Sequence, residues 1–395
     1  MKKIFLLLTI LLFLTPAYGT DNVSFIYING SNNNDEKMAN WYEKGVRKLH
    51  PVLRNKFLKN SAIKKYYKVL GGLNINEEPI IYFWGYESKN DLEFVKSKLE
   101  ISKAVSSIGG YAVKNLLTEY LHDAIWVQKP QHMLPIVDGL NEYVKKEAKK
   151  GNQVVLYGYS AGTFVTYEYM FNKLRFINVP ELLGELGTSD EIVKYAKNNK
   201  VNDTCVSAIS NSKYPIGTIS QTGRLVLNQN DEQLKTNLSK LNETTEESCA
   251  PVDKFRGIVN FASPLPLFYS DLGDDDYELN YYNKYMFKYV LENAIFVLTV
   301  NFSEDPLGFP TSRNLTIKDM EELMGIKTVN PTGMIYDNSS VWSKRPFVLA
   351  HTSYWSARRV FSKAIVNSFV SGYKFQYDEK YQAKMIKRNK KKSEL

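Results

Sequence analysis

Short hydrophobic runs alternate with amphipathic stretches through most of the chain. Six runs are rich in β-branched and aromatic residues and nearly continuous in hydrophobicity, which is typical of strands buried on both faces. These runs cover 23–30, 79–85, 153–158, 257–262, 294–300 and 333–336. Helical periodicity lies between them, over 36–48, 90–104, 133–149, 161–174, 276–292 and 354–371. The alternation predicts an α/β fold in which a mostly parallel central sheet of about six strands is flanked by helices.

One long segment interrupts this alternation. Residues 176–254 are polar, rich in Asn, Ser, Thr, Glu and Lys, and too long for an ordinary loop of a compact domain. The segment predicts a cap or lid inserted between two strands, although a flexible excursion without function fits the composition as well. It contains both cysteines of the chain, Cys205 and Cys249, and either a disulfide or two independent thiols is compatible with the sequence.

The N-terminus has the pattern of a signal peptide over residues 1–19. Lys2 and Lys3 precede the apolar run 4–13, and the small residues Ala17 and Gly19 suit cleavage after Gly19. The apolar run is shorter than the roughly 20 residues that a spanning helix needs. We therefore expect an exported protein, periplasmic or secreted, whose folded domain covers 20–377 and which meets an oxidising environment.

Charge and composition exclude several classes of function. The formal net charge is +9, and the C-terminal tail 378–395 carries seven basic and three acidic residues. Such a tail is either a solvated terminus or a peripheral contact for anionic lipid. No basic patch interleaved with aromatic residues occurs elsewhere, so no nucleic-acid partner is expected. Two cysteines and four scattered histidines form no metal-binding pattern, so neither a metal nor a cofactor is expected.

The strongest chemical signal is Gly158-Tyr159-Ser160-Ala161-Gly162, a G-x-S-x-G sequence. It directly follows a predicted buried strand and directly precedes a predicted helix. A strand–turn–helix setting is what this motif requires, because a strained turn lifts the serine hydroxyl above the edge of the sheet. Ser160 is therefore a candidate nucleophile.

A serine hydroxyl needs a general base, and histidine is the side chain best suited to neutral pH. Three of the four histidines precede Ser160 in the chain, and only His351 follows it, after the last strand signal. Asp305, in the loop after the run 294–300, is the best candidate for the carboxylate that orients the histidine. Glu304 and Asp271 are its competitors.

Two backbone N–H groups are needed to stabilise an oxyanion. The N–H of Ala161 follows the nucleophile at a helix N-terminus. The turn after the first strand, at Gly30 and Ser31, is the expected second source, although it could equally be a plain strand exit.

Taken together, these motifs resemble the α/β-hydrolase superfamily on its lipase and esterase side. The resemblance rests on residues 158–162, on Asp305-Pro306, on His351-Thr352-Ser353-Tyr354-Trp355 and on Ser263-Pro264-Leu265, and it covers roughly 22–372 in order of elements. It implies a triad of Ser160, His351 and Asp305 and an acyl-enzyme mechanism without a cofactor. Two departures are Asn29-Gly30, where a His-Gly pair is common, and the absence of the first two strands of a full eight-stranded sheet.

The sequence thus leads us to expect an exported ester hydrolase acting on a small-molecule or lipid ester, with an apolar acyl group. Acyl transfer or amide cleavage by the same triad is an alternative reaction. A catalytically inactive lipid-binding protein of the same fold is the alternative from another class.

Overall fold

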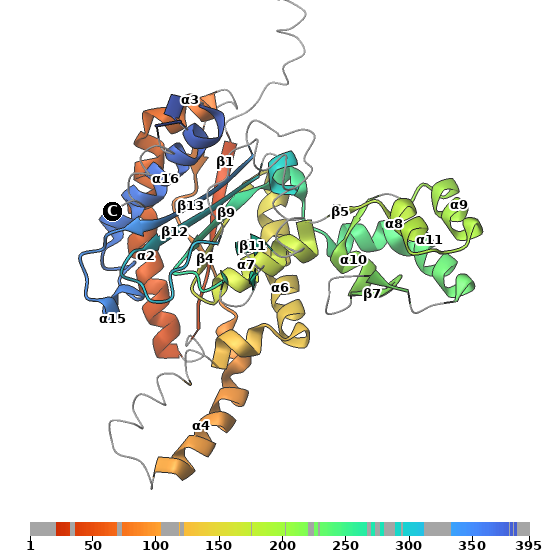
Figure 1. Ribbon diagram of the computed structural model, residues 1–395, viewed down its shortest axis with the longest axis horizontal. Helices are drawn as coiled ribbons and strands as arrows, with labels where there is room; N and C mark the ends of the chain where they lie inside the picture. The colour runs from red at the N-terminus through yellow and green to blue at the C-terminus, as the bar shows by residue number, and fades with distance from the viewer. Residues whose placement is uncertain are drawn as a thin grey trace, which may run out of the picture.

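The computed structural model (Figure 1) describes most of the chain between residues 21 and 384. The described residues are 21–31, 36–68, 73–103, 118, 122–174, 176–201, 203–219, 225–227, 230–266, 270–272, 277–279, 289–293, 295–311, 333–378, 380–381 and 383–384. The predicted signal peptide 1–19 and the basic run 387–392 lie outside these residues. Within them, no helix is both long and apolar enough to cross a membrane.

The centre of the structure is a twisted parallel sheet in the order β13-β12-β9-β4-β1-β2, with β3 also paired to β1. The strands are β1 (Asp21–Ile28), β2 (Leu73–Ile75), β3 (Ile80–Tyr82), β4 (Gln153–Tyr159), β9 (Phe255–Phe261), β12 (Phe296–Phe302) and β13 (Met334–Val341). The short strands β2 and β3 pair with successive halves of β1 and share one position in the sheet. Every described pairing in this sheet is parallel. The predicted α/β class and all six predicted strands are confirmed, while the short strand β2 was not predicted.

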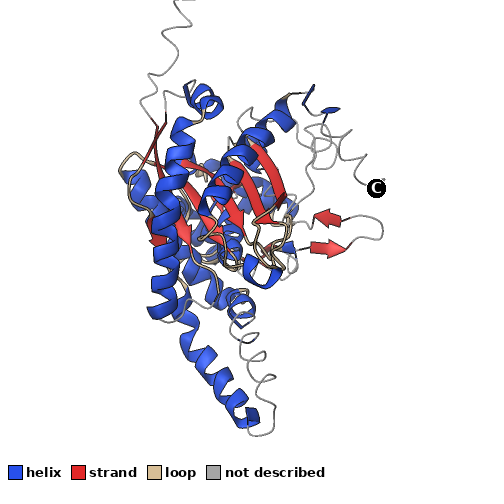
Figure 2. Cartoon of the chain, turned by 90° about the vertical axis from the view of Figure 1, so that its left-hand side faces the viewer, coloured by secondary structure: helices blue, strands red, loops and turns tan. Residues whose placement is uncertain are grey.

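Helices cover both faces of the sheet, which makes three layers (Figure 2). On one face, α2 (Glu36–Lys59) packs beside α16 (Arg358–Tyr377), and their apolar residues form a core with alternate residues of β1 and β4 such as Phe25 and Tyr157. On the other face, α6 (Pro130–Lys149) and α7 (Gly162–Tyr169) cover the intervening residues, such as Ile26 and Leu156. Because the side chains of a strand alternate, each strand contributes to both cores. This double burial explains why the strands read as continuous apolar runs.

Several predicted helices differ from the observed ones. The helix predicted at 36–48 extends to Lys59, and the one predicted at 161–174 ends as α7 and continues as a π-helical turn over Met170–Leu174. The helix predicted at 276–292 is wrong at its start, because Tyr277–Leu279 is strand β11, antiparallel to β10 (Ser270–Leu272). Pairing with another segment overrides local periodicity there. Further described helices include α3 (Ser61–Lys68), α4 (Lys89–Lys103), α15 (Phe347–Ala350) and the 3-10 turns Gly85–Ser88 and Val252–Lys254.

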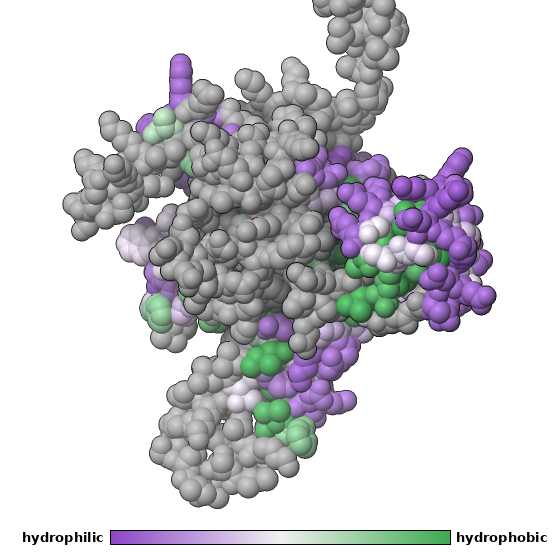
Figure 3. All heavy atoms as spheres, turned by 45° about the vertical axis from the view of Figure 1, so that its right-hand side comes forward, coloured by the Kyte–Doolittle hydropathy of each residue, from purple (hydrophilic) through white to green (hydrophobic). Residues whose placement is uncertain are grey.

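Segment 176–254 folds into a subdomain beside the sheet, seen on the right of Figure 1. It contains α8 (Val179–Glu185), α9 (Asp190–Asn198), α10 (Val206–Ser210), α11 (Asp231–Ser248) and the short strands β5 (Phe176–Ile177), β6 (Thr204–Cys205), β7 (Thr218–Ile219) and β8 (Leu225–Val226). It has a separate apolar core that includes Leu183, Ile209 and Leu238, and much of its visible outer surface is hydrophilic (Figure 3). Cys205 and Cys249 form a disulfide within it. Of the two alternatives for the cysteines, the structure therefore has the pair.

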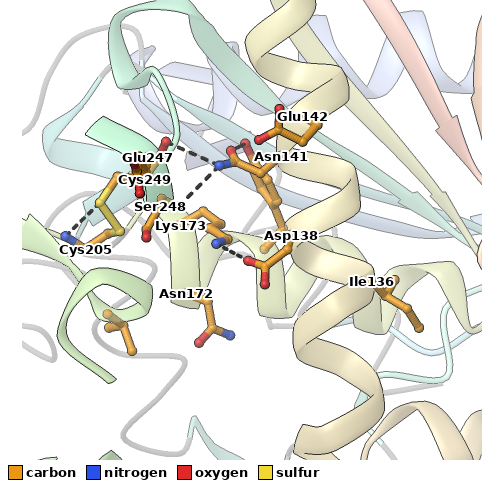
Figure 4. Close-up of polar contacts among 12 residues, drawn as sticks. Ile136, Asp138, Asn141, Glu142, Asn172, Lys173, Cys205, Glu247, Ser248 and Cys249 are labelled. Carbon is orange, nitrogen blue, oxygen red and sulfur yellow. Dashed lines mark hydrogen bonds and ion pairs between the residues drawn. A yellow bond between two sulfur atoms is a disulfide. The ribbon is translucent and has the colours of Figure 1, made fainter. Parts of the chain in front are cut away.

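The subdomain is attached near the amino ends of the central strands, whereas Ser160 lies at the carboxyl end of β4. It leaves the main domain after α7 and the π-helical turn, which run back from the end of β4, and it returns at the start of β9. Polar contacts cross the seam between the two parts (Figure 4), beside apolar contacts of Val206 and Ala250 with the core of the main domain. The amide of Asn141 on α6 donates to the carbonyl oxygens of Ser248 and Cys249, and the ammonium of Lys145 on α6 donates to the carbonyl oxygen of Glu247. These contacts fasten the subdomain to the middle and the C-terminal part of α6.

Candidate active site

Ser160 stands at the end of the fully buried strand β4, in the turn that leads into α7. Its φ angle is 52°, in the left-handed region that non-glycine residues rarely adopt. The strained conformation is held by the N–H of Ser160, which donates to the carbonyl oxygen of Phe261 at 3.0 Å at the end of the neighbouring strand β9. The sequence motif is therefore a strained strand-to-helix turn, as its setting predicted.

Two glycines let the surrounding backbone approach this turn. A Cβ atom on Gly162 would lie 2.5 Å from the carbonyl oxygen of Asn29, and one on Gly30 would lie 2.8 Å from Cβ of Ser160. Real Cβ atoms do not approach other atoms so closely, so the end of β1 contacts the serine turn only because both positions are glycine. The predicted oxyanion turn at Gly30 thus lies directly against Ser160.

His351 joins the serine to a carboxylate. Its Nε2 lies 2.9 Å from Oγ of Ser160, and its Nδ1 lies 2.9 and 3.2 Å from the two carboxylate oxygens of Asp305. An ionised carboxylate only accepts hydrogen bonds, so Nδ1 carries the proton and Nε2 is left to accept from the serine hydroxyl. All three residues are at least 94 % buried, and the three predicted side chains form one continuous hydrogen-bonded chain.

Asp305 is itself fixed by two further donors. The N–H of Leu307 donates to one carboxylate oxygen at 2.9 Å, and the hydroxyl of Tyr354 donates to the other at 2.8 Å. The N–H of Phe302 in turn donates to the Tyr354 hydroxyl. Burial, followed by the negative charge of Asp305, raises the pKa of Tyr354 well above its usual value, so this hydroxyl stays protonated as a donor. The sequence around His351 contains Tyr354 but does not reveal this contact with Asp305.

Of the two competitors for the carboxylate, Glu304 has a described side chain, and that side chain bonds away from His351. Glu304 points to another loop, where it accepts hydrogen bonds from the N–H groups of Ser343 and Lys344 at 3.0 to 3.1 Å. Burial would raise the pKa of Glu304, but these hydrogen bonds outweigh it and hold the pKa below its usual value. Asp271 belongs to strand β10, whose side chains are outside the described set. Asp305 is the carboxylate that the structure brings to the histidine.

The predicted oxyanion turn is held by a clamp that the sequence did not reveal. The indole Nε1 of Trp84 donates to the carbonyl oxygen of Asn29 at 2.6 Å, and the N–H of Trp84 donates to Oδ1 of Asn29 at 2.9 Å. The Asn29 side chain also donates to the carbonyl oxygen of Gly30 at 3.0 Å. Since a peptide unit is planar, fixing these carbonyls also fixes the directions of the Gly30 and Ser31 N–H groups. Ala161, the other predicted source, is the N-cap of α7, where N–H groups lack partners within the helix.

A pocket of about 270 Å³ opens at Ser160 and His351. Its wall is completed by residues from the first turns of α2, from the turn after β1, from the serine turn and from the residue after His351: Ser31, Lys37, Met38, Trp41, Tyr159 and Thr352. None of these described lining residues belongs to the inserted subdomain. The α2 residues were not among the predicted site residues, because nothing in a helix pattern tells which end of it faces a cleft.

The three other histidines have partners elsewhere. His50 is buried between the hydroxyl of Tyr27 and the carbonyl oxygen of Asn76, His132 stacks on Trp126, and His122 lies beside Asp123. Among the described residues, no group of three His, Cys, Asp or Glu side chains is placed to hold a metal ion. Comparison with known proteins finds no matching family model, no matching curated protein and no matching solved structure.

Proposed function

We propose that this protein is a serine hydrolase that cleaves carboxylic esters. The observation that carries the proposal is the hydrogen-bonded chain from Ser160 through His351 to Asp305, built on a strained turn at the end of a central strand. Strain of this kind persists only where the surrounding structure enforces it, and it is concentrated at functional sites.

Each reaction step has a group of this chain to perform it. Oγ of Ser160 attacks the ester carbonyl carbon while Nε2 of His351 takes the hydroxyl proton, and Asp305 stabilises the resulting imidazolium. The oxyanion faces the N–H of Ala161 and the clamped turn at Gly30 and Ser31. His351 then returns the proton to the departing alcohol. In the second half, His351 deprotonates a water molecule that attacks the acyl-enzyme, and the acid leaves as the proton returns to Ser160.

The pocket supports an ester with a short acyl group. A volume of about 270 Å³ is slightly below the lower end of ordinary ligand pockets, which range over roughly 300–1,000 Å³. Met38, Trp41 and Tyr159 give it an apolar and aromatic wall, which suits an apolar acyl group. Segment 176–254 is anchored at the opposite edge of the sheet, so we do not assign it the role of a lid over Ser160.

The same features support membership of the α/β-hydrolase superfamily. The strand that ends at Ser160 lies inside a parallel sheet, between β1 and β9, and the three residues occur in the chain order Ser, Asp, His. The second oxyanion donor comes from the turn after β1, which replaces the common His-Gly pair with Asn29-Gly30. The Trp84 clamp offers a physical means of fixing that turn without the histidine.

Hydrolysis of p-nitrophenyl acetate, butyrate and octanoate by the purified protein tests this proposal. We expect Ser160→Ala to lose at least about 10³-fold in kcat/KM, because it removes the nucleophile. Ser356→Ala, a surface change five residues after His351, is the matched control and keeps activity. Butyrate is expected to exceed octanoate, and a fluorophosphonate probe is expected to label the wild type at Ser160.

Two outcomes contradict the proposal. Full activity in Ser160→Ala assigns the chemistry to another residue. A folded wild-type protein that neither hydrolyses these esters nor reacts with the probe is a binding protein of this fold. Addition of an alcohol acceptor to the same assay distinguishes hydrolysis from acyl transfer, because transfer yields a new ester in place of the free acid.

A further inference from the structure

A short surface segment beside His351 concentrates exposed apolar residues. Trp342, Phe347 and Leu349 are 65 %, 62 % and 56 % exposed, although large apolar side chains are usually buried. All three fall within eight residues, the 342–349 segment, which ends two residues before His351. Lys344 and Arg345 are exposed in the middle of this segment, and the Lys344 ammonium lies 5.8 Å from the centre of the Trp342 ring.

The 342–349 segment is held in a defined conformation. The carboxylate of Glu304 accepts hydrogen bonds from the N–H groups of Ser343 and Lys344, and the Ser343 hydroxyl accepts one from the N–H of Arg345 at 3.1 Å. Lys344 has a φ angle of 63°, a conformation that lysine adopts only when its surroundings impose it. The exposure of the apolar side chains is therefore built into the fold, on the loop next to the one that carries Asp305.

We propose that the 342–349 segment docks the protein on an anionic lipid surface, with the pocket mouth at the interface. The residue composition of the segment indicates that a lipid surface is what it binds. Tryptophan with neighbouring Lys and Arg suits the headgroup region, Phe and Leu suit the acyl boundary, and the two cations complement anionic headgroups. The segment ends three residues before Thr352, which lines the pocket at Ser160, so the segment is close in the chain to the pocket wall.

The area of the segment argues against a second protein as the occupant. The three apolar side chains expose roughly 400 Å² in total, given the 150–250 Å² that a large side chain can bury. A stable protein complex buries about 800 Å² on each partner. Insertion into a bilayer has no such requirement, because a few side chains and two cations are enough for reversible binding.

Vesicle cosedimentation tests the docking independently of any hydrolysis. The full-length Ser160→Ala protein is mixed with vesicles of equal parts phosphatidylglycerol and phosphatidylcholine, and with vesicles of phosphatidylcholine alone. We expect binding to the anionic vesicles and, after Phe347→Ser with Leu349→Ser, a partition coefficient at least about tenfold lower. Phe94→Ser with Ile125→Ser removes two equally exposed apolar side chains from another surface and is the matched control, expected to bind normally.

Tryptophan fluorescence gives a second measurement. Trp342 is strongly exposed, Trp41 in the pocket wall is partly exposed, and Trp84, Trp126 and Trp355 are at least 94 % buried, so aqueous iodide should quench Trp342 most and Trp41 less. Anionic vesicles are expected to protect the Trp342 emission, and Trp342→Phe is expected to remove most of the quenchable emission while vesicle binding persists.

Four results overturn the proposal. The first is that the wild type fails to bind the vesicles, and the second is that it binds neutral and anionic vesicles equally. Binding survives the Phe347 and Leu349 changes but is lost when the basic residues of 387–392 are changed to serine, which assigns it to the tail. Alternatively, sedimentation velocity shows a dimer that the same double change dissociates, which makes a second copy the occupant.

Discussion

The edge of the sheet that carries Ser160 and the subdomain at 176–254 are organised by opposite means. Ser160 and His351 are 191 positions apart in the chain and meet because strands β4, β12 and β13 end at the same edge. The subdomain, by contrast, takes its core from a single continuous segment and is closed by one disulfide that spans 44 positions. The site therefore depends on the register of the whole sheet, whereas the subdomain depends on local contacts.

This difference separates two kinds of sensitivity. A small change at the site alters the geometry of the reacting atoms, because three loops must agree to within a fraction of an ångström. A change in the subdomain alters its own stability, and its anchorage through α6 lies at the far edge of the sheet. Activity and subdomain stability should consequently respond to different mutations.

The largest expected effect is that of Asp305→Asn on catalysis. An asparagine amide at this position donates a hydrogen bond to Nδ1 of His351, so the ring proton moves to Nε2. A protonated Nε2 can no longer accept the proton of the Ser160 hydroxyl. We expect kcat to fall about 10³–10⁴-fold, with the melting behaviour of the subdomain unchanged. Ester hydrolysis and circular dichroism measure the two quantities.

Glu304→Gln is the adjacent control for this change. Glu304 contacts the 342–349 segment instead of His351, so kcat should stay within about threefold of the wild type. A loss in Glu304→Gln as large as that in Asp305→Asn would make the whole loop, and not the carboxylate at His351, the origin of the effect.

Removing the disulfide should have the next largest effect. It should lower the stability of the subdomain and leave kcat unchanged. In Cys205→Ser with Cys249→Ser, the unfolded segment regains the freedom that the closed loop removes, at an expected cost of about 2–4 kcal/mol. We expect proteolytic cleavage to begin within 176–254 while kcat at 25 °C stays close to the wild type. Limited proteolysis with mass spectrometry, alongside the ester assay, measures both. A matching fall in kcat would mean that the two regions are coupled after all.

Trp84→Phe should have the smallest effect of the three. It keeps the aromatic ring but removes the indole N–H that holds the Asn29 carbonyl oxygen, so the oxyanion turn becomes less well oriented. We expect kcat to fall about tenfold, or about 1.4 kcal/mol, with KM nearly unchanged.

Trp126→Phe provides the comparison, because its indole N–H donates to Asp91, away from the serine turn. Activity should persist in that variant. If both tryptophan changes lower kcat equally, the clamp on Asn29 has no specific part in orienting the turn.

The strands and the turn at Ser160 could be predicted from local sequence, whereas the carboxylate partner of His351 could not be singled out. Strands buried on both faces leave long apolar runs, and the serine turn leaves a fixed spacing of glycines around Ser160, so both are readable locally. Asp305 could be placed only among three candidate acids. Its selection depends on how the loops after β12 and β13 meet, and the same loops direct Glu304 toward Ser343 instead.

By itself, the sequence determined the α/β class and the strained turn at Ser160, and its four histidines left His351 as the candidate base. Tertiary structure alone decided that Cys205 pairs with Cys249, that the subdomain attaches at the edge opposite Ser160, and that Trp84 clamps the Asn29 turn. The physical reason is the distance along the chain over which each kind of interaction acts. Burial patterns and turn strain act over a few neighbouring residues, whereas hydrogen bonds between distant loops exist only once the sheet has fixed where each strand ends.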